Sequence, residues 1–211
     1  MARSKSSNRW LTEHFKDQYV IQAQKEGFRS RAVYKLEELN DKDQLFKPGQ
    51  HIIDLGAAPG GWSQWLSQKL QHKATIIATD ILPMDALPDV TFIQGDFTEQ
   101  AVLDSILSEM GDDLADLVIS DMAPNMSGMD AIDQPKAMYL VELALDLAVQ
   151  VLRKNGSFVC KAFHGAGFQQ WHDLLKQNFA VVKSRKPKAS RSRSREVYIV
   201  AKGFKGANNQ A

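Results

Sequence analysis

The chain has 211 residues, of which 44% are hydrophobic and 24% charged, as expected for one globular domain with a sizeable core. No run of about 18 uncharged apolar residues occurs, and no apolar stretch follows the basic N-terminal segment, so neither a membrane span nor a secretory signal is expected. The single cysteine, Cys160, excludes an internal disulfide and a four-cysteine zinc site. We expect a single domain over residues 1–211 in the cytoplasm.

The net charge of +1 hides a segregation of charge along the chain. Residues 1–35 carry eight basic and three acidic side chains, and residues 181–205 carry nine and one, whereas residues 36–180 sum to −12. Basic ends on an acidic body favour a bound polyanion, although solvated tails would give the same pattern. The Arg/Ser-rich stretch 183–195 leads directly into an apolar run, which predicts an anchored loop that contacts nucleic acid.

The first predicted elements surround a glycine-rich turn. A helix is expected over residues 30–39, with Ser30 as its N-cap. A short β-branched run at 51–55 predicts a buried strand, and the stretch 61–70 after the turn predicts a helix. Further along the chain, apolar runs predict strands at 74–80, 90–96 and 115–121, with an amphipathic helix at 99–110 before the last of them.

The longest helical pattern covers residues 133–156. Pro135 is expected in its first turn, and Gly156 is placed where a C-terminal cap would lie. A strand at 157–163, a helix at 167–179 and a strand at 196–204 follow. Strands that alternate with helices predict an α/β fold with a mostly parallel sheet covered by helices on both faces.

The turn after the first predicted strand reads GAAPGG, from Gly56 to Gly61. It matches a dinucleotide fingerprint only weakly, because the central glycine is missing. Pro59 also removes an N–H where a pyrophosphate would need one. A nicotinamide-dependent oxidoreductase is therefore a minor alternative, and a tight turn without a ligand is another.

Acidic residues follow three of the predicted strands. Asp54 ends the first strand, Asp80 ends the second 24 positions after Gly56, and Asp96 follows the third. An acid at the place of Asp80 is typical of a ligand with a ribose diol. Carboxylates would repel a polyphosphate but favour a cationic, phosphate-free nucleoside. S-adenosylmethionine has this chemistry.

Several motifs together resemble the FtsJ/RrmJ family, the bacterial large-subunit ribosomal RNA methyltransferases that act on a uridine ribose 2′-hydroxyl. The resemblance runs from about Arg9 to Ala201, and no motif position departs from the family pattern. The motifs are GFRSRAVYKL, DLGAAPGGWSQWL, ATDILPMD, QGDF, SDMAPNMSG, AMYLVELAL and SREVYIVA. The family implies a class I S-adenosylmethionine-dependent, Rossmann-like methyltransferase fold with seven strands, the last one antiparallel.

The resemblance also implies the site residues. Those that bind the cofactor would be Gly60, Trp62, Asp80, Asp96 and Asp121. The catalytic tetrad would be Lys35, Asp121, Lys161 and Glu196. Without the family, Trp62 would be read as a helix-packing aromatic, and Lys161, in an apolar strand, as a lysine that reaches solvent from a strand edge. In the implied scheme, Lys161 takes or orients the proton of the 2′-hydroxyl.

Base methylation is less well supported by the sequence. Pro124 is followed by Asn125 and Met126, so the loop lacks the aromatic platform of amino-methylating enzymes. Cys160, inside a strand, is expected to be a small buried residue rather than a nucleophile. The histidines show no ligand spacing, so no metal site is predicted.

The resemblance implies 23S ribosomal RNA, in the assembled or assembling 50S subunit, as the partner, with neither DNA nor a membrane. The basic side chains expected to hold the RNA are Arg29, Arg31, Lys35 and the run 191–195. A monomer is the default expectation. A non-catalytic RNA-binding assembly factor with the same basic ends is the main alternative from another class.

Overall fold

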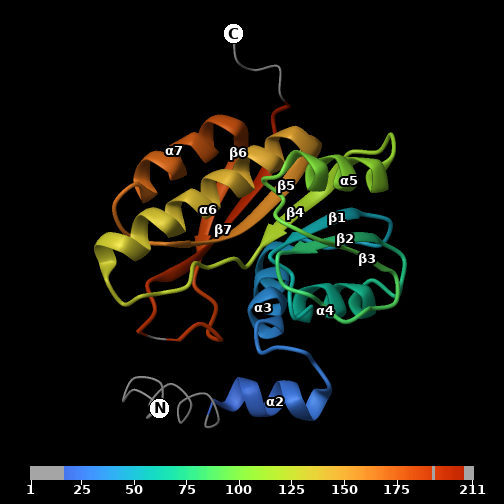
Figure 1. Cartoon of the computed structure of the whole chain (residues 1–211), viewed down its shortest axis with the longest axis horizontal. Helices are drawn as coiled ribbons and strands as arrows, with labels where there is room; N and C mark the ends of the chain where they lie inside the picture. The colour runs from blue at the N-terminus through green and yellow to red at the C-terminus, as the bar shows by residue number, and fades with distance from the viewer. Residues whose placement is uncertain (1–16, 192, 207–211) are drawn as a thin grey trace.

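The computed structural model describes residues 17–191 and 193–206 and contains one sheet of seven strands in the order β3-β2-β1-β4-β5-β7-β6 (Figure 1). Adjacent strands from β3 to β5 are parallel, and β7 runs antiparallel to both β5 and β6. This is the predicted α/β methyltransferase sheet, including the antiparallel last strand. Residues 1–16 of the basic segment 1–35, and Ser192 of the basic loop, lie outside the described residues.

Helices and strands alternate along most of the chain. The strands are β1 (His51–Leu55), β2 (Thr75–Asp80), β3 (Val90–Gln94), β4 (Ala115–Ser120), β5 (Leu152–Phe163), β6 (Phe179–Arg185) and β7 (Glu196–Phe204). The helices are α2 (Gln18–Glu26), α3 (Val33–Asp43), α4 (Gly61–Lys69), α5 (Gln100–Met110), α6 (Asp130–Val151) and α7 (Phe168–Asn178). Within the described ranges, no helix is long and apolar enough to cross a membrane.

The period-two alternation of the strands divides the core between two faces of the sheet. Ile53 of β1 and Phe158 of β5 belong to the core that α5, α6 and α7 cover. Ile52 and Val159, one position away in the same strands, belong to the core covered by α3 and α4. The two groups of helices lie on opposite sides of the sheet in Figure 1. Because Lys161 is two positions after Val159, its side chain lies on the α3 face.

The strand order reverses between β1 and β4, which places a topological switch point at the carboxyl edge of the sheet. In an open α/β sheet a ligand binds outside this edge, in the crevice between the loops that follow the two strands. Here those loops are the glycine-rich turn after β1 and the SDMAPN segment after β4. The fold therefore brings together the two most specific motifs of the sequence.

The structure corrects three local predictions. The longest helix begins at Asp130 and ends at Val151, so Pro135 lies beyond the first turn and Gly156 is no helix cap. Gly156 instead lies inside β5, where an added Cβ would come within 2.9 Å of the Arg153 carbonyl oxygen. The Ser30 hydroxyl accepts a hydrogen bond from the Ala32 amide, but α3 begins only at Val33, so Ser30 is not its N-cap.

Candidate active site

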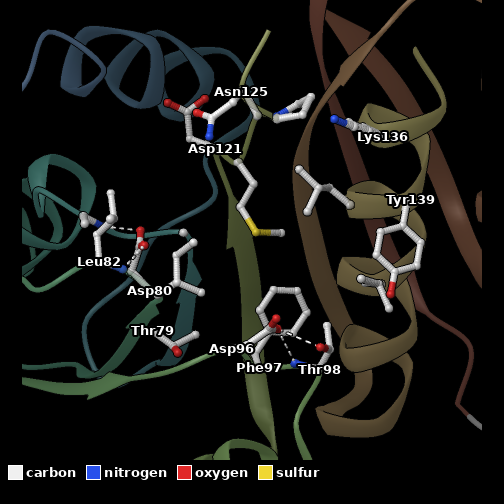
Figure 2. Close-up of a pocket in the computed structure, with 18 of the residues that line it drawn as sticks. Thr79, Asp80, Leu82, Asp96, Phe97, Thr98, Asp121, Asn125, Lys136 and Tyr139 are labelled. Atoms are coloured by element: carbon white, nitrogen blue, oxygen red, sulfur yellow. Dashed lines mark hydrogen bonds between the residues drawn. The ribbon is translucent and has the colours of Figure 1, made fainter. Parts of the chain in front are cut away.

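A cavity opens at the switch point, between the carboxyl ends of β1 to β4 and helix α6 (Figure 2). Figure 2 shows Asp80 and Leu82 on one side, Tyr139 and Lys136 of α6 on the other, Asp121 and Asn125 near one end, and Asp96, Phe97 and Thr98 near the opposite end. A smaller hollow shares Gly56, Ala58 and Asp121 with this cavity, and adds Ser30, Asp54 and Trp62. The two hollows therefore adjoin at these shared residues, and Asp121 lies at their junction.

Asp80 holds two loops of this cavity in place. Its carboxylate accepts hydrogen bonds from the Ala58 amide in the glycine-rich turn, at 2.9 Å, and from the Leu82 amide, at 2.8 Å. Gly56, with φ +71°, allows the turn to approach the SDMAPN segment, since an added Cβ would come within 2.3 Å of Met122 Cγ. Asp80 therefore lies in the wall of the cavity and joins two of its loops.

Asp96 and Phe97 form the far wall of the cavity. The Asp96 carboxylate is exposed and accepts hydrogen bonds from the amide and the hydroxyl of Thr98, at 2.9 and 2.7 Å. Phe97 is half-buried and packs against the core under α5 and α6. An apolar ring beside the Asp96 carboxylate gives this end of the cavity the mixed apolar and polar lining that is typical of small-molecule sites.

Two residues that the family implies for the cofactor, Gly60 and Trp62, lie at the end of the glycine-rich turn and in the first turn of α4. Gly60 has φ +99° and precedes α4, and it is not among the residues that line either cavity. Trp62 lines the smaller hollow, but its side chain is only 3% exposed and donates a hydrogen bond from Nε1 to the Ala32 carbonyl oxygen, at 2.8 Å. Its indole therefore packs α4 against α3.

Asp54 is a buried carboxyl group at the floor of the smaller hollow. Burial raises its pKa to about 7, the negative charges of Asp121 and Asp80 act in the same direction, and a hydrogen bond from the Ser63 hydroxyl, at 2.7 Å, opposes them. Because the folded protein holds this proton more tightly than the unfolded chain, Asp54 stabilises the fold in full below about pH 4, and this stabilisation is lost as the pH rises through about 7.

We expect Asp54→Asn to remove this pH dependence, because the amide oxygen can still accept from Ser63 and carries no proton to lose. Between pH 4 and 7 the free energy of unfolding of the original chain should fall relative to that of the variant, by up to about 1.4 kcal/mol per pH unit. Urea denaturation across this range measures the difference. The exposed Asp112→Asn controls for the loss of one carboxylate, and an equal slope in both variants would contradict the assignment.

The four residues of the implied tetrad meet beside Asp121. Lys161 Nζ lies 3.0 Å from Asp121 Oδ1 and also donates to the Asp121 carbonyl oxygen. Lys35 Nζ, from α3, lies 3.0 Å from Glu196 Oε1 at the start of β7. Both lysines are largely buried, at 8% exposure for Lys35 and 7% for Lys161. The fold thus brings together these four side chains, which come from α3, β5, β7 and the segment after β4.

Tyr198, which sequence reasoning did not single out, connects the two ion pairs. It is opposite Lys161 in the antiparallel pairing of β5 and β7, and its side chain is fully buried on the α3 face. Its hydroxyl accepts a hydrogen bond from Lys35 Nζ, at 2.9 Å, and donates one to Asp121 Oδ1. The only available sequence signal was its position two residues after Glu196, which places both side chains on one face of a strand.

The charges of this network keep its carboxyl groups ionised. Burial alone would raise the pKa of Asp121, but the neighbouring charges of Lys161 and Lys35 hold it below its ordinary value. Burial likewise opposes ionisation of Glu196, and Lys35 lowers its pKa in the same way. The pKa of Tyr198 is raised well above 10.0 by burial and by the charges of Asp121 and Glu196, so its hydroxyl stays protonated.

Cys160 has the structural role that the sequence predicted. Its side chain is 1% exposed in the core under α6 and α7, and burial raises its thiol pKa to about 12. A protonated, inaccessible thiol cannot act as the nucleophile of a base methyltransferase. In the part of the chain that the structure describes, no group of three or more His, Cys, Asp or Glu side chains could hold a metal ion.

The basic stretch 183–195 is anchored to the rest of the fold, but residues 183–185 belong to β6 and only the part after Arg185 forms the expected loop. Glu38 of α3 accepts hydrogen bonds from the Lys188 and Ala189 amides, at 2.9 and 3.0 Å. Arg195 forms an ion pair with Asp130 at the start of α6, at 2.6 Å. Arg31, expected to hold RNA, donates to the Ala189 carbonyl oxygen and forms an ion pair with Asp17. The loop is therefore attached to α3 at Lys188 and Ala189 and to the start of α6 at Arg195.

Comparisons with known proteins identify the family of the chain. A family model described as FtsJ-like methyltransferase matches residues 28–204. A relative from Cellvibrio japonicus named ribosomal RNA large subunit methyltransferase E is 62% identical over 206 residues, which cover 98% of each chain. A relative of the same name from Pseudomonas aeruginosa PAO1 is 60% identical and is covered completely. A solved Plasmodium falciparum structure, described as a candidate ribosomal RNA methyltransferase, is 31% identical, with a TM-score of 0.77 over 85% of this chain and 100% of that one. On this similarity and on its own fold, the chain belongs to the FtsJ-like methyltransferase family.

Proposed function

We propose that the chain transfers a methyl group from S-adenosylmethionine to the ribose 2′-hydroxyl of a uridine in large-subunit ribosomal RNA. The observation that carries this proposal is the Lys161–Asp121 pair at 3.0 Å, located at the junction of a cavity with three carboxylates. Carboxylates and an apolar wall suit a cationic nucleoside, whereas a pyrophosphate would be repelled. The names of the relatives, which specify ribosomal RNA of the large subunit, support the choice of acceptor.

The donor, when bound, supplies an electrophilic methyl carbon on a sulfonium whose departure as a neutral thioether is easy. The protein must therefore position the acceptor oxygen in line, about 3–3.5 Å from that carbon, and manage the hydroxyl proton. Lys161 directs two of its N–H groups to Asp121, one to Oδ1 and one to the carbonyl oxygen. An amino group so held has one direction left, and we assign it to the 2′-oxygen and its proton.

Lys35 and Glu196 are assigned to the ribose and its neighbours. Their ion pair is tied to Asp121 through Tyr198, so the acceptor side and the donor side of the site share one rigid network. A ribose hydroxyl as acceptor selects RNA over DNA, since DNA lacks this group. The exposed cations Lys136 and Lys188, together with the anchored loop, are assigned to phosphates, which position the strand without reading its sequence.

The decisive experiment is transfer of a tritiated methyl group to 50S subunits prepared from cells that lack this modification. We expect one label per subunit, located on a uridine ribose when the modified nucleotide is mapped by mass spectrometry. Transfer to a nucleobase would refute ribose as the acceptor. Subunit binding without transfer would favour the non-catalytic assembly factor. Calorimetric titration that detected NAD but not S-adenosylmethionine would favour the oxidoreductase.

Subunit binding should also weaken steeply with salt, because phosphate contacts release counterions. Between 50 and 200 mM salt we expect the affinity to fall by roughly 10³-fold if about six phosphates are contacted. Filter binding at graded salt concentrations measures the slope. A nearly flat dependence would show that the basic segments do not hold the RNA.

A further inference from the structure

The loop between β2 and β3 forms one wall of the large cavity without having a helix or strand of its own. Ile81 and Leu82 line the cavity and are 67% and 59% exposed. On the side that faces the cavity, the Leu82 amide donates a hydrogen bond to the Asp80 carboxylate. Arg29 also binds this loop, through backbone carbonyl groups that do not line the large cavity.

The guanidinium of Arg29 bridges this loop and the glycine-rich turn. Nη1 donates to the Asp85 carbonyl oxygen at 2.7 Å and to the Pro59 carbonyl oxygen at 3.3 Å. Nη2 donates to the Ala86 carbonyl oxygen at 2.9 Å. The planar fork of an arginine allows one side chain to hold several carbonyl groups in a fixed relation. Asp80 joins the same two segments from the cavity side, through the Ala58 and Leu82 amides.

Arg29 is itself fixed in position at its backbone. Its amide donates to Gln64 Oε1 of α4 at 2.9 Å, and Gln64 Nε2 donates to the Gly27 carbonyl oxygen, also at 2.9 Å. Its side chain passes close over Gly60, where an added Cβ would come within 2.9 Å of Nη1. The positive φ of Gly60 favours glycine there, and any side chain at this position would also have to displace the Arg29 guanidinium.

We infer that Arg29 is a positioning residue for the methyl donor and not a contact to RNA phosphate. Its guanidinium donates to three backbone carbonyls, of Pro59 in the glycine-rich turn and of Asp85 and Ala86 in the loop whose first residues line the large cavity. Loss of these bonds would leave the Asp80 carboxylate to join the two segments, because Gln94 and Ser67 bind only the ends of the β2–β3 loop. The inference rests on the proposed function, since it concerns the donor of that same site.

The test compares Arg29→Ala with Arg29→Lys and with Lys188→Ala, an exposed cation of the basic loop. For Arg29→Ala we expect the Kd for S-adenosylhomocysteine, measured by calorimetry, to rise about tenfold, as the loss of up to three hydrogen bonds to exposed carbonyls allows. The KM for the donor should rise while kcat changes little, and the Kd for 50S subunits should stay within about twofold. Arg29→Lys should be intermediate, because an ammonium cannot span all three carbonyls. Lys188→Ala should give the opposite pattern.

The inference is overturned if Arg29→Ala binds the donor product normally but binds subunits more weakly. A second readout separates this failure from failure of the proposed function. Hydrogen exchange of the amides of residues 81–90 in the free protein should be faster in Arg29→Ala than in the original chain. If the original chain bound no donor, the proposed function would fail. Unchanged hydrogen exchange in Arg29→Ala would independently refute the role of Arg29 in holding the β2–β3 loop. Far-UV circular dichroism confirms that each variant is folded.

Discussion

Replacement of Lys161 by methionine should lower kcat for methyl transfer about a thousandfold, the effect typical of removing a group that manages a proton in the transition state. Methionine preserves the length of the side chain inside the apolar strand β5, so packing should change little. Donor binding should persist, because Lys161 does not line either cavity. Single-turnover transfer to 50S subunits measures kcat, and calorimetry with S-adenosylhomocysteine measures the donor affinity.

Two further variants accompany this experiment, Lys154→Met as a control and Tyr198→Phe as a test of the hydrogen-bond network. Lys154→Met changes an exposed lysine of the same strand and should leave transfer unaffected. Tyr198→Phe retains the buried ring but removes both hydrogen bonds of the hydroxyl, and it should lower kcat about tenfold, since each charge-assisted bond is worth about 1.5–3 kcal/mol before the site readjusts. Unchanged turnover in Lys161→Met would remove this lysine from the mechanism, whatever the other variants did.

The sequence predicted the fold where local pattern and tertiary environment agree. Strands β1, β2 and β4 are buried on both faces, so their continuous apolar runs are easily recognised. Strand β6 was missed because it lies at the sheet edge and most of its side chains are exposed, leaving no apolar run to distinguish it from the basic stretch that follows. The helix α2 was missed as well, since only two of its residues, Val20 and Ala23, are buried.

The prediction of the C-terminal end of α6 failed for a different reason. Gly156 after a long helical pattern is a reasonable C-cap from the sequence alone. In the structure the chain passes from Val151 of the helix directly into β5, and pairing with β4 jumps from Leu152 to Ser157. The glycine is needed there because the backbone of the irregular segment folds closely on itself. Such a requirement arises from tertiary contacts and leaves no periodic signal.

Some residues of the candidate site could likewise be placed from the sequence, and others could not. Asp80, Asp96 and Asp121 follow strands and so could be placed at one edge from the sequence. The meeting of Lys35 with Glu196 could not be worked out from spacing, and it came only from the family resemblance. Tyr198 and the inward role of Arg29 depend on which side chains face each other across α3, β5 and β7, which a single sequence does not reveal.

A second large effect is expected outside the cavity, at Asp43, whose removal should destabilise the fold by about 3 kcal/mol. This side chain is almost fully buried at the C-terminal end of α3. Its two oxygens accept from Arg185 Nε and Nη2 of β6, at 2.7 and 2.9 Å, and Lys202 of β7 donates to its carbonyl oxygen. Burial alone would raise the pKa of Asp43, but Arg185, Lys202 and Lys183 hold it below its ordinary value.

The sign of the pH dependence follows from this shift. Because the folded-state pKa of Asp43 is lowered, its contribution to stability is present above about pH 4 and is lost as the pH falls through the folded value. This is the reverse of the contribution of Asp54. The difference in the free energy of unfolding between the original chain and Asp43→Ala should therefore shrink in acid, whereas the original chain should lose stability relative to Asp54→Asn as the pH rises.

Urea denaturation of Asp43→Ala at neutral pH tests the magnitude, with the exposed Asp41→Ala of the same helix as the matched control. Most of the cost comes from leaving Arg185 beside a site that no longer neutralises it, so Asp43→Ala combined with Arg185→Met should be more stable than Asp43→Ala alone. Equal stability of Asp43→Ala and Asp41→Ala would contradict the assignment. Since α3 carries Lys35 and β7 carries Glu196, loosening this anchor should also separate the acceptor pair, and transfer by folded Asp43→Ala should fall while donor affinity is retained.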